Sequence, residues 1–256
     1  MAWRALSTLN GIDTVLWHAS ELALADSNAV QPSDHPALDA QLPGGGWPIG
    51  GLCEILQARS GLHEWRLLSP ALRALTAKVQ PDARRSEMPQ IVLAGAPYAP
   101  FGPGLAGQGL DVRALLWVRA ETLTQRLWTA EQALRCTGVA AVLAWLPGVC
   151  SDHLRRLQLA AHDHAKLLFV MRPLEAQEAS SPAVLRLRIC SAQSLDDDAI
   201  RVQIIKRRGP PLLQPLQLST PPQPNSTCHS RIADRMAMER GRSDGVHALD
   251  RPAAAA

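Results

Sequence analysis

Residues 42–64 read LPGGGWPIGGLCEILQARSGLHE, and this stretch decides the fold. It opens with a glycine-rich run, Leu42–Gly51, whose glycines and prolines favour a turn. An apolar segment follows, Leu52–Leu56, which is typical of a buried strand. A turn, a strand and a loop in this order predict the entrance to a nucleotide-binding α/β domain.

The loop after that strand, Gln57–Glu64, stands where a phosphate-binding loop is expected. A working loop of the form G-x-x-x-x-G-K-[ST] needs a lysine for the terminal phosphates and a serine or threonine for Mg²⁺. This chain has Leu62 and His63 after the last glycine, so the lysine is missing. The residues of this degenerate loop are Arg59, Ser60, Gly61, Leu62 and His63.

Composition indicates a folded protein. The chain has 256 residues, 46% of them apolar and 19% charged, with a net charge of only +3. That charge is compatible with nucleic-acid contact without indicating it. The five cysteines are scattered without a CxxC pair, so we expect free thiols, no metal site and a cytoplasmic protein. We see no signal-type opening and no apolar run long enough for a membrane helix.

Apolar strands alternate with amphipathic helices through the middle of the chain. Because the strands are continuous apolar runs, we expect a mostly parallel sheet with helices on both faces, an α/β fold. The strands after Leu52–Leu56 are expected at 91–95, 115–118, 139–146 and 167–171, and the helices at 64–78, 123–137 and 152–166.

The pattern changes after Met171. Segments 184–190 and 200–206 alternate apolar and polar residues, which predicts antiparallel strands at the sheet edge with Arg186 and Arg188 on a solvated face. We divide the chain into an N-terminal extension with a helical pattern and linker (1–36), a core domain (37–218) and a tail that composition indicates is disordered (219–256).

The order of glycine run, strand, loop and helix resembles the RecA-like recombinase core, in which a Gly-Gly-Gly-x-Pro-x-Gly stretch leads into a Glu-Ile strand and the phosphate loop. Segment 109–116 resembles the part of that family after its second strand. Segment 200–208, followed by Pro210 and Pro211, resembles its closing strand. The resemblance runs from about Leu38 to Pro211.

More closely, the chain resembles the ImuA family, RecA-like proteins associated with mutagenic translesion synthesis in bacteria. Segments at six places carry this resemblance, in the same order along the chain. They are 38–48, 116–119, 130–135, 142–147, 154–160 and 205–209.

The resemblance also locates two positions at which RecA-like ATPases carry acidic residues. An acidic residue after the second strand orients water in RecA-like ATPases, and Ala96 is nearest to that position here. A magnesium-associated Asp should end strand 139–146, and Trp145 stands in its place. Neither alanine nor indole can supply a carboxylate. We therefore expect no catalytic residues, no ATP hydrolysis and no cofactor. Whether ATP or ADP still binds without hydrolysis stays open.

Four residues are candidate contacts with a partner or DNA: Trp47 in the glycine run, and Lys206, Arg207 and Arg208 at the end of the last long strand. For the basic run 206–208, a contact with a partner or DNA and an exposed strand end without a contact are equally good interpretations. The other tryptophans within predicted elements, Trp65, Trp117, Trp128 and Trp145, are expected to pack in the core. A pair of histidines, His162 and His164, has poor spacing for a metal.

The resemblance implies a non-catalytic accessory protein or scaffold of an SOS-induced translesion complex. Its implied partners are an ImuB-type Y-family polymerase homologue, the alpha subunit of a specialised replicative-type polymerase and RecA, with DNA contact also possible. Two alternatives stay open at this point. One is a SulA-type cell-division inhibitor, and the other is a DNA-dependent ATPase or recombinase.

Overall fold

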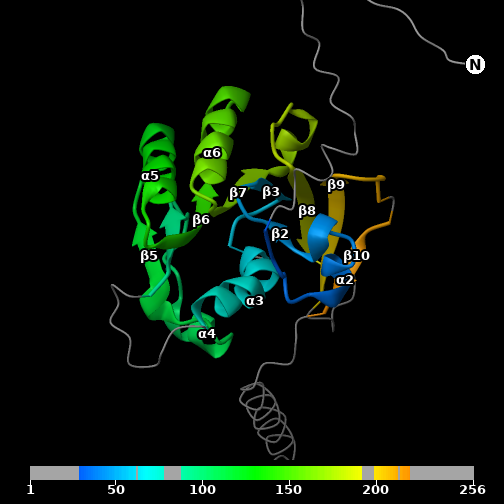
Figure 1. The fold of residues 1–256 in the computed structure, drawn as a ribbon, viewed down its shortest axis with the longest axis horizontal. Coiled ribbons are helices and arrows are strands. Elements are labelled where there is room, and N and C mark those ends of the chain that lie inside the picture. Colours follow the sequence, from blue (N-terminus) through cyan, green and yellow to red (C-terminus); the bar gives the residue numbers. More distant parts are fainter. Residues whose placement is uncertain (1–28, 62, 78–87, 192–198, 213, 220–256) are drawn as a thin grey trace, which may run out of the picture.

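The computed structural model describes residues 29–61, 63–77, 88–191, 199–212 and 214–219 (Figure 1). The helix expected in the N-terminal extension, Leu62 of the loop and the tail beyond Ser219 lie outside these ranges.

One eight-stranded sheet, in the order β10-β9-β8-β3-β7-β6-β4-β5, organises the described chain. Strand β3 (Leu52–Gln57) lies near the centre, and its neighbours on both sides run parallel to it. The other strands are β4 (Gln90–Ala94), β5 (Leu115–Val118), β6 (Val139–Trp145), β7 (Leu167–Pro173), β8 (Leu185–Ser191), β9 (Ile200–Lys206) and β10 (Leu216–Leu218). A separate two-stranded pair joins β1 (Val30–Gln31) to β2 (Trp47–Pro48). The predicted α/β fold with a mostly parallel sheet is confirmed.

The antiparallel part of the sheet differs in detail from the expectation. Strands β8 and β9 pair antiparallel to each other, as predicted, but β8 also pairs parallel with β3 and is therefore an interior strand. The edge is β10, a short strand that the sequence did not indicate. As an interior strand, β8 has no fully solvated face, which bears directly on Arg186.

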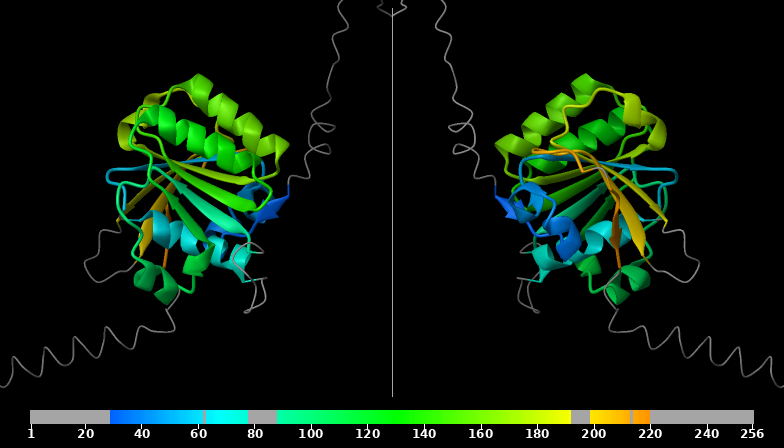
Figure 2. Two further views of the ribbon diagram at one scale, coloured as in Figure 1. Left: turned by 90° about the vertical axis from the view of Figure 1, so that its left-hand side faces the viewer. Right: turned by 90° about the vertical axis from the view of Figure 1, so that its right-hand side faces the viewer.

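Helices cover both faces of the sheet (Figure 2). On one face lie α2 (Pro36–Asp39), α3 (Glu64–Thr76) and α4 (Gly102–Gly107), and on the other lie α5 (Leu123–Arg135) and α6 (Ser151–Asp163). Short 3₁₀ turns are η1 (Pro43–Gly45), η3 (Val112–Ala114) and η4 (Leu174–Glu178). Helix α4 was not predicted because its sequence, GPGLAG, is rich in helix-breaking residues. None of the helices in the described ranges combines the length and apolar character needed to cross a membrane.

The strand side chains divide between two apolar layers with the period of two that a pleated strand imposes. In β6, Ala141, Leu143 and Trp145 belong to the layer under α3, whereas Val142 and Ala144 belong to the layer under α5 and α6. Both layers are buried, which explains why the central strands read as continuous apolar runs.

Trp47 belongs to the first of these layers, which corrects its assignment as a contact residue. Its side chain is 0% exposed, and its ring meets Phe169 edge-on at a centroid distance of 5.2 Å. The core prediction holds for Trp145, at 4% exposure, but is wrong for Trp128, which is 64% exposed, and for Trp117, at 38%. Strand β5 forms the second sheet edge, so Trp117 has no strand beyond it.

A buried carboxylate, Glu54, lies in the middle of β3. It is 0% exposed and points to the face of the sheet that carries α5 and α6, together with Arg172 of β7 and Arg186 of β8. The Arg172 Nη1 group donates to Glu54 Oε1 at 2.9 Å, and Arg186 Nε donates to Oε2 at 2.6 Å. The Ser181 hydroxyl adds a donor to Oε1 at 2.8 Å. One carboxylate therefore links three adjacent strands.

Backbone carbonyls satisfy most of the remaining guanidinium donors. Arg186 donates to the carbonyl oxygens of Ala176 and Gln177 in η4, and Arg172 donates to that of Val149. The expectation that Arg186 faces solvent is therefore wrong, because η4 covers this part of the sheet and the side chain is 8% exposed. Buried charges are tolerated when they are paired and hydrogen-bonded in this way.

Replacing Glu54 by alanine should lower the free energy of unfolding by about 3–5 kcal/mol, because two buried guanidinium groups lose their counter-ion. Urea denaturation measures this loss. The control is Glu178→Ala at an exposed position. Exchanging the whole cluster, Glu54→Leu with Arg172→Met and Arg186→Leu, should recover most of the stability. A loss below about 1 kcal/mol for Glu54→Ala would show that the cluster contributes little.

Candidate functional site

The carboxyl ends of the parallel strands carry the candidate site. The loop 58–63 follows β3, the loop 95–101 follows β4, and the loop 146–150 follows β6. Strands β3 and β4 are consecutive along this part of the chain, yet β7 and β6 lie between them in the sheet. Ligands of open α/β sheets bind at this edge, where the chain crosses from one part of the sheet to another.

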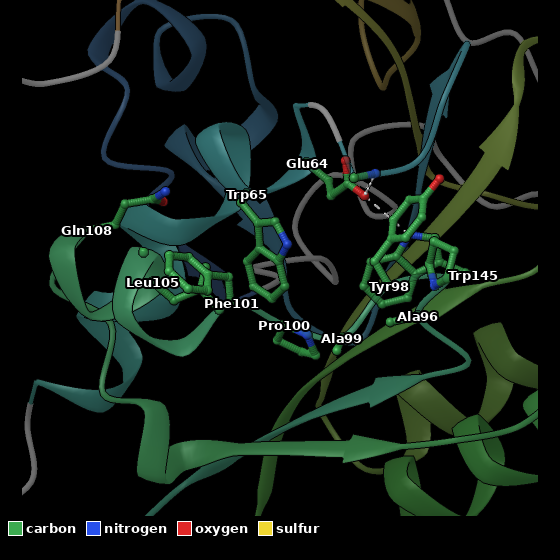
Figure 3. Close-up of a pocket in the computed structure, with 13 residues that line it drawn as sticks. Glu64, Trp65, Ala96, Tyr98, Ala99, Pro100, Phe101, Leu105, Gln108 and Trp145 are labelled. Atoms are coloured by element: carbon green, nitrogen blue, oxygen red, sulfur yellow. Dashed lines mark hydrogen bonds between the residues drawn. The ribbon is translucent and has the colours of Figure 1, made fainter.

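The carboxylate of Glu64, the first residue of α3, occupies the centre of the degenerate loop. Its Oε1 accepts hydrogen bonds from the Gly61 backbone N–H and, at 3.3 Å, from the Trp145 indole Nε1. Its Oε2 accepts from the His63 backbone N–H at 3.2 Å. Figure 3 shows this carboxylate between the loop and the ring of Trp145. Glu64 is 1% exposed.

This arrangement is an anion site that the chain fills itself. The first N–H groups of a helix lack partners within the helix, and its N-terminus favours negative charge. Phosphate-binding loops use those N–H groups to hold a phosphate. Here α3 has no side-chain cap from His63, and the N–H groups of the loop point at the carboxylate of Glu64 instead.

Trp145 ends β6, where the resemblance placed a magnesium-associated Asp. Its indole N–H is a donor without acceptor capacity, so it serves the Glu64 carboxylate and could not hold a cation. Ala96 is half-buried and lines the same hollow as Glu64 and Trp145. The structure thus brings Ala96, Trp145 and the loop together around one hollow.

The remaining described residues of the loop have separate environments. His63 is half-buried, and its Nε2 lies 3.1 Å from the Ser191 hydroxyl. Burial lowers the pKa of the His63 imidazole below its ordinary value, and the Arg66 guanidinium lowers it further against the opposing effect of Glu64. Arg59 is exposed, and Ser60 lines a smaller hollow.

The basic run after β9 lies apart from this loop. Arg207 donates to the Pro210 carbonyl at 2.9 Å and to the backbone and side-chain oxygens of Gln41, so it ties the C-terminal part of the sheet to α2. Lys206 is exposed and donates to the Ser181 carbonyl at 3.1 Å. Arg208 is exposed as well. Lys206 and Arg208 are the exposed contact candidates of the basic run, whereas Arg207 is half-buried.

Sequence reasoning missed Glu64, the residue on which this site depends. The available signal was an acidic residue in the first turn of a predicted helix, directly after a glycine loop that lacks its lysine. It also missed the aromatic residues Tyr98 and Phe101, which lie in a Pro- and Gly-rich segment and are 68% and 72% exposed.

The fold and site define an α/β protein with a mostly parallel sheet and a loop after β3 that lacks the lysine of a phosphate-binding loop. No protein-family model matches the chain. The chain is similar to Protein ImuA of Caulobacter vibrioides, with 30% identity over 160 residues to the proteins of strain NA1000 / CB15N and strain ATCC 19089 / CIP 103742 / CB 15. The match covers 59% of this chain and 61% of each relative, so the chain spans less than two thirds of their length. This similarity confirms the resemblance to ImuA.

Replacing Glu64 by alanine should lower the free energy of unfolding by about 1–3 kcal/mol, because three N–H donors lose their acceptor. Sulfate should then stabilise the variant more than it stabilises the original chain, since an added anion can take the empty position. Urea denaturation with and without sulfate measures both effects.

The control for general salt effects is Glu121→Ala, at an exposed position before α5. An equal gain from sulfate in the original chain and in both variants would contradict the assignment of Glu64 as the internal anion.

Proposed function

We propose that this protein is a non-catalytic RecA-like component of a bacterial translesion synthesis system and works through contacts with other proteins. The similarity to Protein ImuA supports a place in translesion synthesis, because the ImuA family resemblance implies that role. The proposed partners are an ImuB-type polymerase homologue, the alpha subunit of a specialised replicative-type polymerase and RecA. DNA contact through Lys206 and Arg208 is part of the same proposal.

One observation carries the non-catalytic part of the proposal. The anion position of the loop holds the chain's own Glu64, and that carboxylate is fixed by Trp145, which stands where a metal-binding Asp would be needed. A nucleotide phosphate at this loop would have to displace a buried carboxylate or lie against it, and two like charges at such a distance repel. The loop lacks its lysine, Ala96 and Trp145 stand where acidic residues are expected, and Glu64 fills the anion position. All of these features act against ATP hydrolysis.

The purified chain should hydrolyse ATP no faster than protein-free buffer, with or without single-stranded DNA. Release of inorganic phosphate measures the rate, and an active recombinase measured in parallel shows that the assay works. Hydrolysis above background that Ser60→Ala or Gly61→Ala abolishes would overturn the non-catalytic assignment and favour a DNA-dependent ATPase.

Deleting the gene from its bacterium should lower the frequency of mutations induced by DNA damage, while survival of undamaged cells stays unchanged. Reintroducing the full chain should restore the frequency, and so should the Trp128→Ser variant if that exposed ring has no part in assembly. An unchanged mutation frequency after deletion would exclude the role. Filamentous growth on overexpression, with no effect on mutagenesis, would favour a SulA-type division inhibitor instead.

A further inference from the structure

A hollow of about 330 Å³ opens beside the degenerate loop, at the carboxyl ends of β3, β4 and β6. Four of its thirteen lining residues are aromatic. In Figure 3, Trp65 and Phe101 lie on one side of it, and Tyr98 and Trp145 lie on the other, near Glu64. Its volume is at the lower end of the roughly 300–1,000 Å³ typical of ligand pockets.

Two of these rings are exposed to an unusual degree, yet both have fixed supports. Tyr98 packs on Gly61, where an added Cβ would lie 2.9 Å from the ring, and Phe101 packs on Gly104, where it would lie 2.8 Å away. Gly61 also has φ = +90°, a conformation that glycine adopts readily. Exposed aromatic side chains gathered around one hollow are the kind of apolar surface that marks an interaction site.

The charge of the hollow indicates the charge of the ligand that it favours. Glu64 is the one charged residue among the described residues that line it, and it forms no ion pair within the described part of the chain. Three N–H groups donate hydrogen bonds to its carboxylate. Arg126, which lines a neighbouring hollow that shares Trp145, donates to the Ala120 and Trp145 carbonyls. A buried negative charge behind aromatic faces attracts a cation and disfavours a phosphate.

We propose that this aromatic hollow binds an arginine side chain of a partner protein. The inference rests on the proposed function, because a non-catalytic component works through such protein contacts. A guanidinium is planar, stacks on aromatic faces and is less strongly hydrated than an ammonium. It would stack between the ring faces, while the buried Glu64 carboxylate at the base of the hollow attracts it. The Gln108 amide, at the far side of the hollow in Figure 3, offers a further polar contact.

The test uses the purified full chain with ¹⁵N-labelled tryptophan and three probes. These are the peptide acetyl-Gly-Arg-Gly-amide, the same peptide with neutral citrulline in place of arginine, and adenosine. We expect the arginine peptide to shift the indole N–H signals of Trp65 and Trp145 and to bind at least about fivefold more tightly than the citrulline peptide, since a desolvated cation–π contact contributes that much.

Variants connect the binding to this hollow. Tyr98→Ser with Phe101→Ser alters exposed rings only and should weaken binding of the arginine peptide at least about fivefold. Trp128→Ser removes an exposed ring on α5, outside the hollow, and should leave binding unchanged. Each of three results would overturn the proposal: equal binding of the citrulline peptide, equal loss in Trp128→Ser, or adenosine shifting the same signals at lower concentration than the arginine peptide.

The outcome is separable from that of the mutagenesis experiment. If the arginine peptide binds but deletion of the gene leaves mutagenesis unchanged, the translesion role is excluded and the arginine site is supported. If deletion lowers mutagenesis as predicted but the arginine and citrulline peptides bind equally, the arginine site is excluded and the translesion role is supported.

Discussion

The buried carboxylate of Glu54 is the interaction on which the centre of the sheet depends. It accepts hydrogen bonds from Arg172 on one neighbouring strand and Arg186 on the other, so it fixes β7, β3 and β8 side by side. The same two guanidiniums reach the carbonyls of η4 and of the loop after β6. The ionic cluster thus links β3 with the loop after β6, and both β3 and β6 carry loops of the candidate site. We expect this cluster to contribute to the register of the three strands more than to stability.

A second carboxylate plays the corresponding part at the loop. Glu64 satisfies N–H groups that a phosphate would satisfy in a nucleotide-binding protein, and it recruits the indole of Trp145 as a further donor. The two carboxylates differ in their partners. Glu54 forms ion pairs with two guanidinium groups, whereas Glu64 accepts hydrogen bonds from N–H groups and forms no ion pair within the described part of the chain, at the base of an aromatic hollow. Glu64 thus gives the loop an acceptor for its N–H groups from within the chain.

Local patterns in the sequence predicted the elements of the fold well, because buried parallel strands and amphipathic helices have distinct periods. Strand 115–118 and strand 200–206 were predicted at their observed bounds. What depended on long-range contacts was missed. We predicted that Arg186 is solvated because apolar and polar residues alternate along its segment. Its carboxylate partner, Glu54, is 132 residues away along the chain, so local sequence could not reveal it. Trp47 read as an exposed loop residue because its packing partner, Phe169, lies on a distant strand. At the site, the sequence located the loop, Ala96 and Trp145, but it could not show that Glu64 turns back into the loop.

Because Glu64 is covalently part of the loop, the local concentration of the anion is constant. In a protein whose loop closes on ATP, shape follows the cellular ratio of ATP to ADP, and hydrolysis limits how long an assembly lasts. We expect a loop that carries its own anion to be insensitive to that ratio. Under the proposed function, complexes containing this chain would have no internal timer, and their lifetime would follow from partner affinity and from the synthesis and degradation of the chain itself.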